Sequence, residues 1–313
     1  MSTIARAHPN IALVKYWGKQ QAPGNIPATP SLSITLDTLL STTWVENAAE
    51  DSITLNGQQV EDQKIITWLT LLREQYDIPL LSIRSENNFP TAAGLASSAS
   101  GFAALITAID HHCNLEMSLS KRSSFARMAS GSAARSILGG FVGLTQPDWI
   151  ARPLLAAERW PLKVVIAITD ESQKTVSSST GMQRSQATSP YYPTWITSSQ
   201  EDYRQAEIAV EQRDFTALGR LAEANCLKMH AVMHSSVPAL IYWRPATLDC
   251  LECIRKLQQS GINVFFTIDA GPQVKAVCTQ EAEQEVIGAL TQVSGVIRTI
   301  SVGLGAGASA ENT

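Results

Sequence analysis

The chain has 313 residues, of which 44% are hydrophobic and 17% are charged, a balance that excludes intrinsic disorder and allows a large buried core. Its formal net charge of −4 argues against a nucleic-acid-binding surface, because such a surface normally carries a basic excess. Five cysteines are an odd number in a chain too long to need disulfide staples, and this favours the reducing cytoplasm.

The first sixty residues are predicted to be mostly β-strand. Residues 31–45 are rich in Ser, Thr, Leu and Ile in rough alternation, and the turn pair Asn56-Gly57 follows a short apolar run. Apolar residues then keep helical spacing over 61–76, and residues 80–85 are predicted to form a strand.

An uncharged stretch runs from Asn87 to Ile109, and its length alone would fit a membrane span. Its asparagines, proline, glycines and serines instead predict a loop that leads into a buried helix over 97–112. The N-terminus also lacks the apolar stretch of a signal peptide. We therefore expect no association with a membrane.

The rest of the chain mixes helices and strands. A helix is predicted over 119–130, with strands over 139–144 and 164–168. Residues 171–200 are dense in Ser, Thr, Gln and Pro and are predicted to be a long loop at a domain boundary. Further helices are predicted over 203–212, 215–233, 247–260 and up to about 293, with strands over 263–268 and 296–302. This mixture predicts an α+β fold.

Two glycine-containing segments could contact phosphate. Gly303-x-Gly305-x-Gly307 lies too close to the end of the sequence for a dinucleotide fold, so a flexible end or a tight turn is preferred. Residues 90–101 are small throughout and lead into the helix predicted from Ser97. Exposed amides at a helix start bind anions, but from the residues alone an ordinary packed loop is equally compatible.

Four charged residues stand out from their surroundings. Lys15 and Lys19 lie in a mostly apolar stretch, where cations need anionic partners; surface lysines on a strand are the alternative. Arg135 is flanked by small residues and could present its guanidinium to a carboxylate or phosphate, or form a salt bridge within the fold. Asp269 ends an apolar strand, as catalytic groups and simple turn residues both do.

Two pairs of potential metal ligands are assigned to core packing. His230 and His234 share a helix face, but no Glu follows His230 as a zinc-protease helix would require. Cys250 and Cys253 have no second pair.

Several segments resemble the diphosphomevalonate decarboxylase family of the GHMP small-molecule kinase superfamily. They are residues 8–19, 85–101, 130–136 and 269–272, which occur in the family's order along almost the whole chain. The resemblance implies a two-lobed GHMP-kinase-like fold, with mixed sheets packed against helices and a cleft between the lobes. We place the N-terminal lobe, with the phosphate-binding loop, at residues 1–170 and the C-terminal lobe, with Asp269, at 171–313.

The resemblance also implies a function: ATP-dependent decarboxylation of (R)-5-diphosphomevalonate to isopentenyl diphosphate, in the mevalonate pathway of isoprenoid biosynthesis. Asp269, Lys15 and Arg135 would be catalytic, with Lys15 keeping Asp269 ionised and Arg135 holding the substrate carboxylate. The other expected substrate contacts are Asn10, Tyr16, Lys19, Ser130, Ser132 and Ser178. ATP would contact Ser85, Asn87, Gly94, Ala96, Ser97 and Ser98, with Mg²⁺ held mainly through the ATP phosphates. A cytoplasmic homodimer is the family expectation.

One position departs from the family pattern. Some bacterial members have an Arg where this chain has Ser179, so one diphosphate contact is missing or is supplied elsewhere, with Arg184 as a candidate. The alternatives to the main assignment are a phosphomevalonate decarboxylase, a mevalonate 3-kinase, and an inactive phosphometabolite-binding protein on the same fold.

Overall fold

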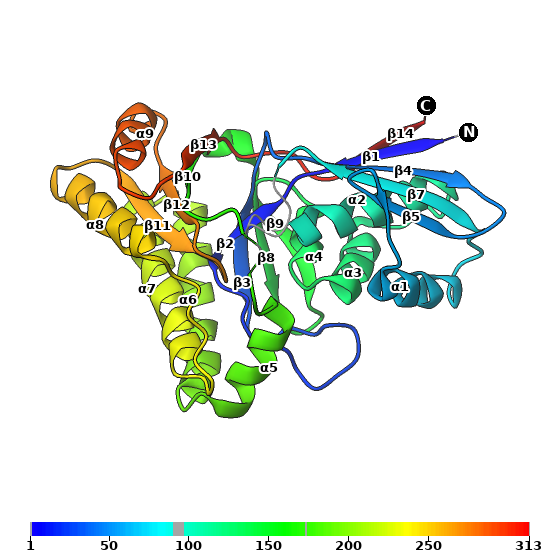
Figure 1. Cartoon of the computed structure of the whole chain (residues 1–313), viewed down its shortest axis with the longest axis horizontal. Coiled ribbons are helices and arrows are strands. Elements are labelled where there is room, and N and C mark those ends of the chain that lie inside the picture. Colours follow the sequence, from blue (N-terminus) through cyan, green and yellow to red (C-terminus); the bar gives the residue numbers. More distant parts are fainter. Residues whose placement is uncertain (1, 90–96, 173, 313) are drawn as a thin grey trace.

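The computed structural model describes residues 2–89, 97–172 and 174–312, and that part of the chain forms three β-sheets and nine α-helices (Figure 1). The largest sheet has the strand order β14-β1-β4-β7-β5-β6 and is antiparallel except between β5 and β7. Its strands are Thr3–Ala7 (β1), Ser41–Asn47 (β4), Ser52–Leu55 (β5), Gln58–Gln59 (β6), Leu81–Asn87 (β7) and Ser309–Asn312 (β14).

Four helices cover one face of this sheet (Figure 1). They are Gln63–Arg73 (α1), Ser97–His112 (α2), Leu119–Ala129 (α3) and Ala133–Ser136 (α4). The burial of β1 alternates along the strand, as expected for a sheet with one face on a core. Trp68 of α1 and Phe102 of α2 meet edge to face in this core.

A second sheet lies in the middle of the molecule (Figure 1). It is antiparallel with the order β2-β3-β8-β9, and its strands are Asn10–Val14 (β2), Ser31–Thr35 (β3), Phe141–Thr145 (β8) and Ile150–Leu155 (β9). Every residue of β2 and β3 is buried. Polar side chains on these strands therefore need partners inside the protein.

The third sheet, with the order β11-β12-β10-β13, has helices on both faces. Its strands are Lys163–Ile168 (β10), Val264–Ile268 (β11), Val274–Cys278 (β12) and Arg298–Val302 (β13). Helices α8 (Pro245–Gln259) and α9 (Glu283–Thr291) pack on one face, and α7 (Phe215–His234) packs on the other. Helix α6 (Tyr192–Gln212) lies against α7 and the central sheet. Helix α5 (Ser178–Thr188) and a short 3₁₀ turn (Ala157–Arg159) complete the described elements.

The prediction of a long loop over 171–200 is wrong from Ser178 onward, where α5 and α6 lie. The Ser177 hydroxyl caps α5 by accepting a hydrogen bond from the Thr180 amide at 3.1 Å, and a proline stands in the first turn of α6. Met182 and Trp195 are buried against Trp17 in one cluster. The residues that resemble a loop by composition thus begin helices, and tertiary packing secures them.

Three strands were not predicted: β9, β12 and β14. Two of them contain a residue that weakens an apolar pattern, Pro153 in β9 and Lys275 in β12, and β14 is short and mostly polar. The segment from Gly303 to Gly307 forms neither the flexible end nor the tight turn that the sequence suggests. The Gly305 amide donates to the Thr35 carbonyl at 2.8 Å, and the Gly305 carbonyl accepts from the Gly140 amide at 2.9 Å. A Cβ on Gly305 would lie 2.1 Å from the Leu36 carbonyl oxygen, so this segment is a close crossing of backbones.

No helix in the described part of the chain is long and apolar enough to cross a membrane.

Candidate active site

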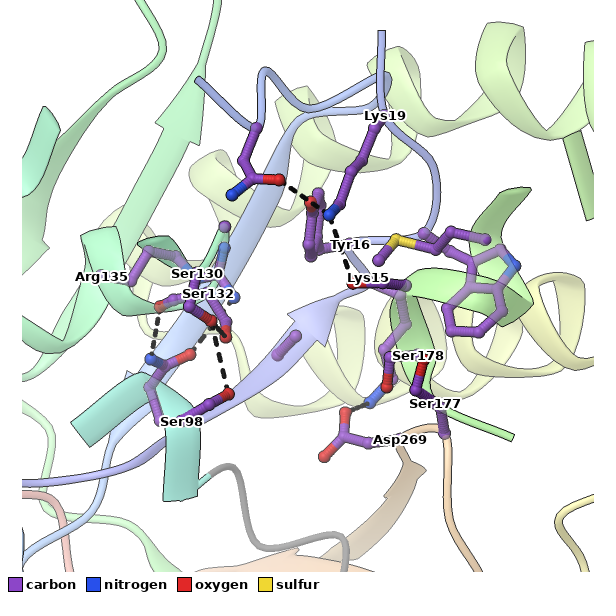
Figure 2. A pocket seen from close by; sticks show the side chains of 18 of the residues that line it. Lys15, Tyr16, Lys19, Ser98, Ser130, Ser132, Arg135, Ser177, Ser178 and Asp269 are labelled. Atoms are coloured by element: carbon purple, nitrogen blue, oxygen red, sulfur yellow. Dashed lines mark hydrogen bonds and ion pairs between the residues drawn. The ribbon is translucent and has the colours of Figure 1, made fainter. Parts of the chain in front are cut away.

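A cavity of about 410 Å³ lies where the central sheet meets α2, α4, α5 and the end of β11. Figure 2 shows its walls, with the side chains of Lys15, Lys19, Arg135 and Asp269 among those drawn. The predicted site residues that line it are Asn10, Lys15, Tyr16, Lys19, Ser97, Ser98, Ser130, Ser132, Arg135, Ser178 and Asp269. Residues predicted from distant segments are thus brought together.

Asp269 is held by two ammonium groups. It follows β11, and its Oδ1 lies 2.7 Å from Nζ of Lys15, which follows β2 (Figure 2). Its Oδ2 lies 3.2 Å from Nζ of Lys275 on β12. Burial by itself would raise the pKa of Asp269, but the two lysines outweigh it and hold the pKa below its usual range. The carboxylate is therefore ionised throughout the neutral range, and its side chain is 28% exposed.

The backbone at Lys15 is fixed by a buried polar relay. The register of β2 shifts between Ala12 and Val14, and the Lys15 amide donates to Oδ1 of Asn225 on α7 at 2.7 Å. Asn225 donates in turn to Asp202 of α6, which also accepts from Lys228. Helices α6 and α7 thus fix the position of the Lys15 backbone.

Arg135 on α4 is 1% exposed and is bonded only to neutral groups in the described structure. Its guanidinium donates to the Ser31 and Ser33 hydroxyls at 2.7 and 3.0 Å and to Asn10 Oδ1 at 3.2 Å. Burial lowers the pKa of Arg135 to about 10, so it stays protonated at neutral pH. No described carboxylate pairs with it within 4 Å, so its charge is available to an anion in the cavity.

A row of hydroxyls connects the start of α2 to the loop before α4. Ser98 and Ser130 lie 3.4 Å apart through their Oγ atoms, as do Ser130 and Ser132 (Figure 2). Ser97 is the first residue of α2, where unpaired amides and the helix dipole favour an anion. The predicted phosphate contacts Gly94 and Ala96 lie outside the described residues.

Tyr16 lies over Gly131, where a Cβ would come within 2.5 Å of the phenol oxygen. The Tyr16 hydroxyl is buried and has no hydrogen-bond partner among the described atoms, and burial raises its pKa, so it remains a protonated donor. A buried orphan donor needs an acceptor. A ligand oxygen in the cavity would supply it.

Lys19 fills part of the space near Ser179. Its Nζ donates to Asn25 at 2.8 Å and to the Ser179 hydroxyl at 3.3 Å. Arg184, the candidate replacement for the arginine of some relatives, donates to the Pro238 carbonyl at 3.3 Å and is not among the described cavity residues.

Sequence reasoning missed three lysines. Lys174 lines the cavity and donates to Ser178 at 2.8 Å and to the Ala270 carbonyl at 3.3 Å. Lys64 of α1 also lines it, and burial lowers the pKa of both lysines. Lys275 interrupts an apolar run of sequence, and this was an available signal. Lys64 gave no such signal, because lysine is ordinary on an exposed helix face.

Ser85 and Asn87 lie on β7, outside the cavity lining that the structure describes. Ser85 bonds with Thr43 at 3.0 Å, and Asn87 accepts from Ser41. Their nucleotide contacts therefore stay predictions.

His230 packs between Trp243 and the end of β11. Its Nε2 lies 3.3 Å from both the Ile268 carbonyl and Trp243 Nε1, and burial lowers its pKa to about 3, so the ring is neutral. The ring of His234 also lies against Trp243.

Comparisons with known proteins agree with this geometry. A family profile described as "Diphosphomevalonate decarboxylase-like N-terminal domain" matches residues 7–148, and one described as "Mevalonate 5-diphosphate decarboxylase C-terminal domain" matches residues 164–303. Diphosphomevalonate decarboxylase of Candida albicans is 33% identical, covering 98% of this chain and 97% of the relative.

Solved structures give the same result. Mevalonate diphosphate decarboxylase from Staphylococcus aureus is 34% identical with a TM-score of 0.92, covering 99% of this chain and 98% of the other. A structure described as "MDDEF in complex with MVAPP, AMPPCP and Magnesium" is 36% identical with a TM-score of 0.91, covering 100% and 99%. With 33% identity to a decarboxylase over 98% of its length and both domains matched, this chain belongs to the diphosphomevalonate decarboxylase family.

Proposed function

We propose that this chain converts ATP and (R)-5-diphosphomevalonate into isopentenyl diphosphate, ADP, phosphate and carbon dioxide. The observation that carries the proposal is the Asp269 carboxylate, held by Lys15 and Lys275 in one cavity with Arg135, whose described partners are all neutral. Relatives support it, since the solved complex holds MVAPP together with AMPPCP and magnesium.

The chemical difficulty is that a tertiary hydroxide is a poor leaving group. The γ-phosphoryl group of ATP passes first to the 3-hydroxyl oxygen, with ADP leaving and the hydroxyl proton released as the new P–O bond forms. The bond between the carboxylate carbon and C2 then breaks, its electron pair forms the C2–C3 double bond, and the C3–O bond breaks to release phosphate. Such a reaction needs positioning and charge stabilisation more than covalent catalysis.

Arg135 is proposed to hold the substrate carboxylate. Its planar fork suits a carboxylate, and the anchors on Ser31, Ser33 and Asn10 fix the plane of the fork. By orienting the carboxylate relative to the C3–O bond, Arg135 would align the breaking bond between the carboxylate carbon and C2 with that C3–O bond. The electron pair of the breaking bond could then form the C2–C3 double bond directly.

Asp269 is proposed to accept a hydrogen bond from the 3-hydroxyl and aim its oxygen at the γ-phosphorus. Because its pKa is held low by two ammonium groups, it is a weak base. We therefore favour orientation over full proton removal before the phosphoryl transfer.

The diphosphate end is proposed to contact the orphan hydroxyl of Tyr16, the ammonium of Lys19 and the hydroxyls of Ser130 and Ser132. The ATP phosphates are proposed to lie at the start of α2, near Ser97 and Ser98. When bound, Mg²⁺ neutralises charge on the phosphates. The described residues hold no group of three or more His, Cys, Asp or Glu fit for a metal, so phosphate oxygens are its expected main ligands.

Two alternatives differ in substrate or outcome. A decarboxylase of the monophosphate would need fewer cations than the cavity provides through Lys15, Lys19, Lys64, Lys174 and Arg135. A 3-kinase that stops after transfer would bind the same substrate carboxylate, so its product, and not Arg135, separates it from a decarboxylase.

The test is product analysis with ATP and Mg²⁺, in matched reactions with diphosphomevalonate, its monophosphate and free mevalonate. We expect isopentenyl diphosphate, phosphate and carbon dioxide in equal amounts from the diphosphate, and much slower turnover of the other two. A 3-phosphorylated product without carbon dioxide would identify a kinase, and no turnover of any substrate would indicate a binding protein.

We also propose a cytoplasmic location and a homodimer. All five cysteines are free, which fits a reducing compartment. The dimer rests on the family resemblance, and measurement of mass in solution tests it.

A further inference from the structure

Lys275 occupies a position on β12 where the strand pattern requires an apolar side chain. Its neighbours Val274 and Ala276 face α8 and α9, while Val277 belongs to the core on the opposite face of the sheet. Lys275 lies on the face of Val277, opposite Thr267 of β11, and is 1% exposed. A buried ammonium on a central strand is costly unless it is paired.

The two lysines at Asp269 differ in their access to the cavity. Lys15, at 2.7 Å from Oδ1, lines the cavity. Lys275, at 3.2 Å from Oδ2, is absent from the described cavity lining. A bound substrate can therefore reach the Lys15 ammonium, whereas Lys275 contacts the Asp269 carboxylate from outside the cavity.

We propose that Lys275 is a positioning residue that fixes the Asp269 carboxylate from outside the cavity, which allows Lys15 to turn toward the phosphoryl oxygens during transfer. This inference rests on the function proposed above. Without a second cation, the movement of Lys15 would leave Asp269 unpaired in a largely buried site. With Lys275 in place, one carboxylate oxygen keeps its partner throughout.

The charges around Asp269 favour a functional role for the pairing of Lys15 and Lys275 with one carboxylate. Two buried ammonium groups share one carboxylate, which leaves excess positive charge that burial penalises, and burial lowers the pKa of Lys275 while Asp269 raises it. The other charged or titratable groups around Asp269 are Arg135 of α4, Lys174 before α5, and Cys226 and the neutral His230 of α7. None of these described groups is a second carboxylate, so Lys15 and Lys275 share the single carboxylate of Asp269.

The test is Lys275→Met, which keeps the length and volume of the side chain and removes its charge. We expect kcat to fall roughly 10- to 100-fold because Asp269 loses its orientation, with KM for diphosphomevalonate within about threefold, since Lys275 lies outside the cavity. Because excess buried charge is removed, the unfolding temperature should be unchanged or raised. A structural lysine would give the opposite result, with lower stability and kcat retained in the folded fraction.

Two further variants separate the explanations. Val277→Ala, on the same strand and face, should lower the unfolding temperature but leave kcat unchanged. In an Asp269→Asn background, Lys275→Met should lower kcat by less than about threefold, because the effects of two residues that act through one another are not additive. An undiminished kcat in Lys275→Met, or an equal loss in both backgrounds, would overturn this inference alone. If the unaltered chain makes no isopentenyl diphosphate, the proposed function fails and this inference fails with it.

Discussion

Arg135 shows how a buried cation can remain available to a ligand. Its three described hydrogen-bond partners are two hydroxyls and an amide oxygen, none of which neutralises its charge. Hydrogen bonds to neutral acceptors use three of the N–H groups and fix the plane of the guanidinium, while the remaining N–H groups and the unit charge stay available to an anion. The salt bridge that the sequence left open as an alternative is not formed in the described structure.

Arg135→Lys tests whether geometry matters beyond charge. Lysine keeps the positive charge but cannot bind a carboxylate through two parallel N–H groups. We expect kcat/KM for diphosphomevalonate to fall at least about 100-fold, as a result of lost positioning, with binding of an ATP analogue retained.

Ser31→Ala is the matched control, because it removes one anchor of the fork and leaves the guanidinium in place. Its loss in kcat/KM should be smaller than that of Arg135→Lys. Steady-state kinetics with varied diphosphomevalonate measure both, and wild-type kcat/KM in Arg135→Lys would refute the carboxylate role.

Single residues could be predicted where the sequence contradicted their expected environment. Lys15 is a cation in an apolar stretch, and Asp269 ends an apolar strand; both line the cavity. Lys174 was not predicted, because a lysine in a polar segment looks solvated, and only the folded chain places it beside Ser178 and Ala270.

At the scale of elements, the end of β2 depends on a helix for its geometry. The Lys15 amide bonds to the Asn225 side chain of α7, which Asp202 of α6 holds in turn. Helix positions can therefore control where a catalytic side chain on a neighbouring strand end lies.

Asn225→Ala tests this relay. It leaves the Lys15 amide and one interaction of Asp202 unsatisfied in the interior, which should reduce the free energy of unfolding by about 1–3 kcal/mol. We also expect a lower kcat in the folded protein, because the backbone of Lys15 is no longer held in position by Asn225. Denaturant unfolding and kinetics on the same sample measure both.

Leu227→Ala serves as the control on the same helix, because Leu227 is 36% exposed. This substitution should reduce the free energy of unfolding by less than about 1 kcal/mol. An Asn225→Ala variant with the stability and kcat of the unaltered chain would show that the relay does not position Lys15.

Elements with strong periodicity could be predicted, and polar elements could not. The spacing of apolar residues indicates α2 and α7 correctly, whereas α5 contains mostly serine, threonine and glutamine and resembles a loop. Its stability comes from the Ser177 cap and from Met182 packed beside Trp17, and the second of these contacts exists only in the folded chain.

At the scale of the whole molecule, the site is assembled from the two ends of the sequence. Lys15 and Asp269 are 254 residues apart, and the last strand, β14, returns to pair with β1 beside the N-terminus (Figure 1). Periodicity could predict an α+β composition but not this return. The family resemblance supplied the two-lobed arrangement, and the division at residue 170 stays a prediction.

Asp269 is central to the proposed activity, since the cavity needs one carboxylate between its cations. The direct measurement is the rate of isopentenyl diphosphate formation by Asp269→Asn, alongside calorimetric binding of an ATP analogue and diphosphomevalonate to the same folded sample. If the uncompensated lysines unfold this variant, Asp269→Asn combined with Lys275→Met removes one of them. We predict that the rate falls by about 10³-fold or more through lost orientation, while both ligands still bind. A folded variant that retains turnover within about tenfold of the unaltered chain would contradict the account.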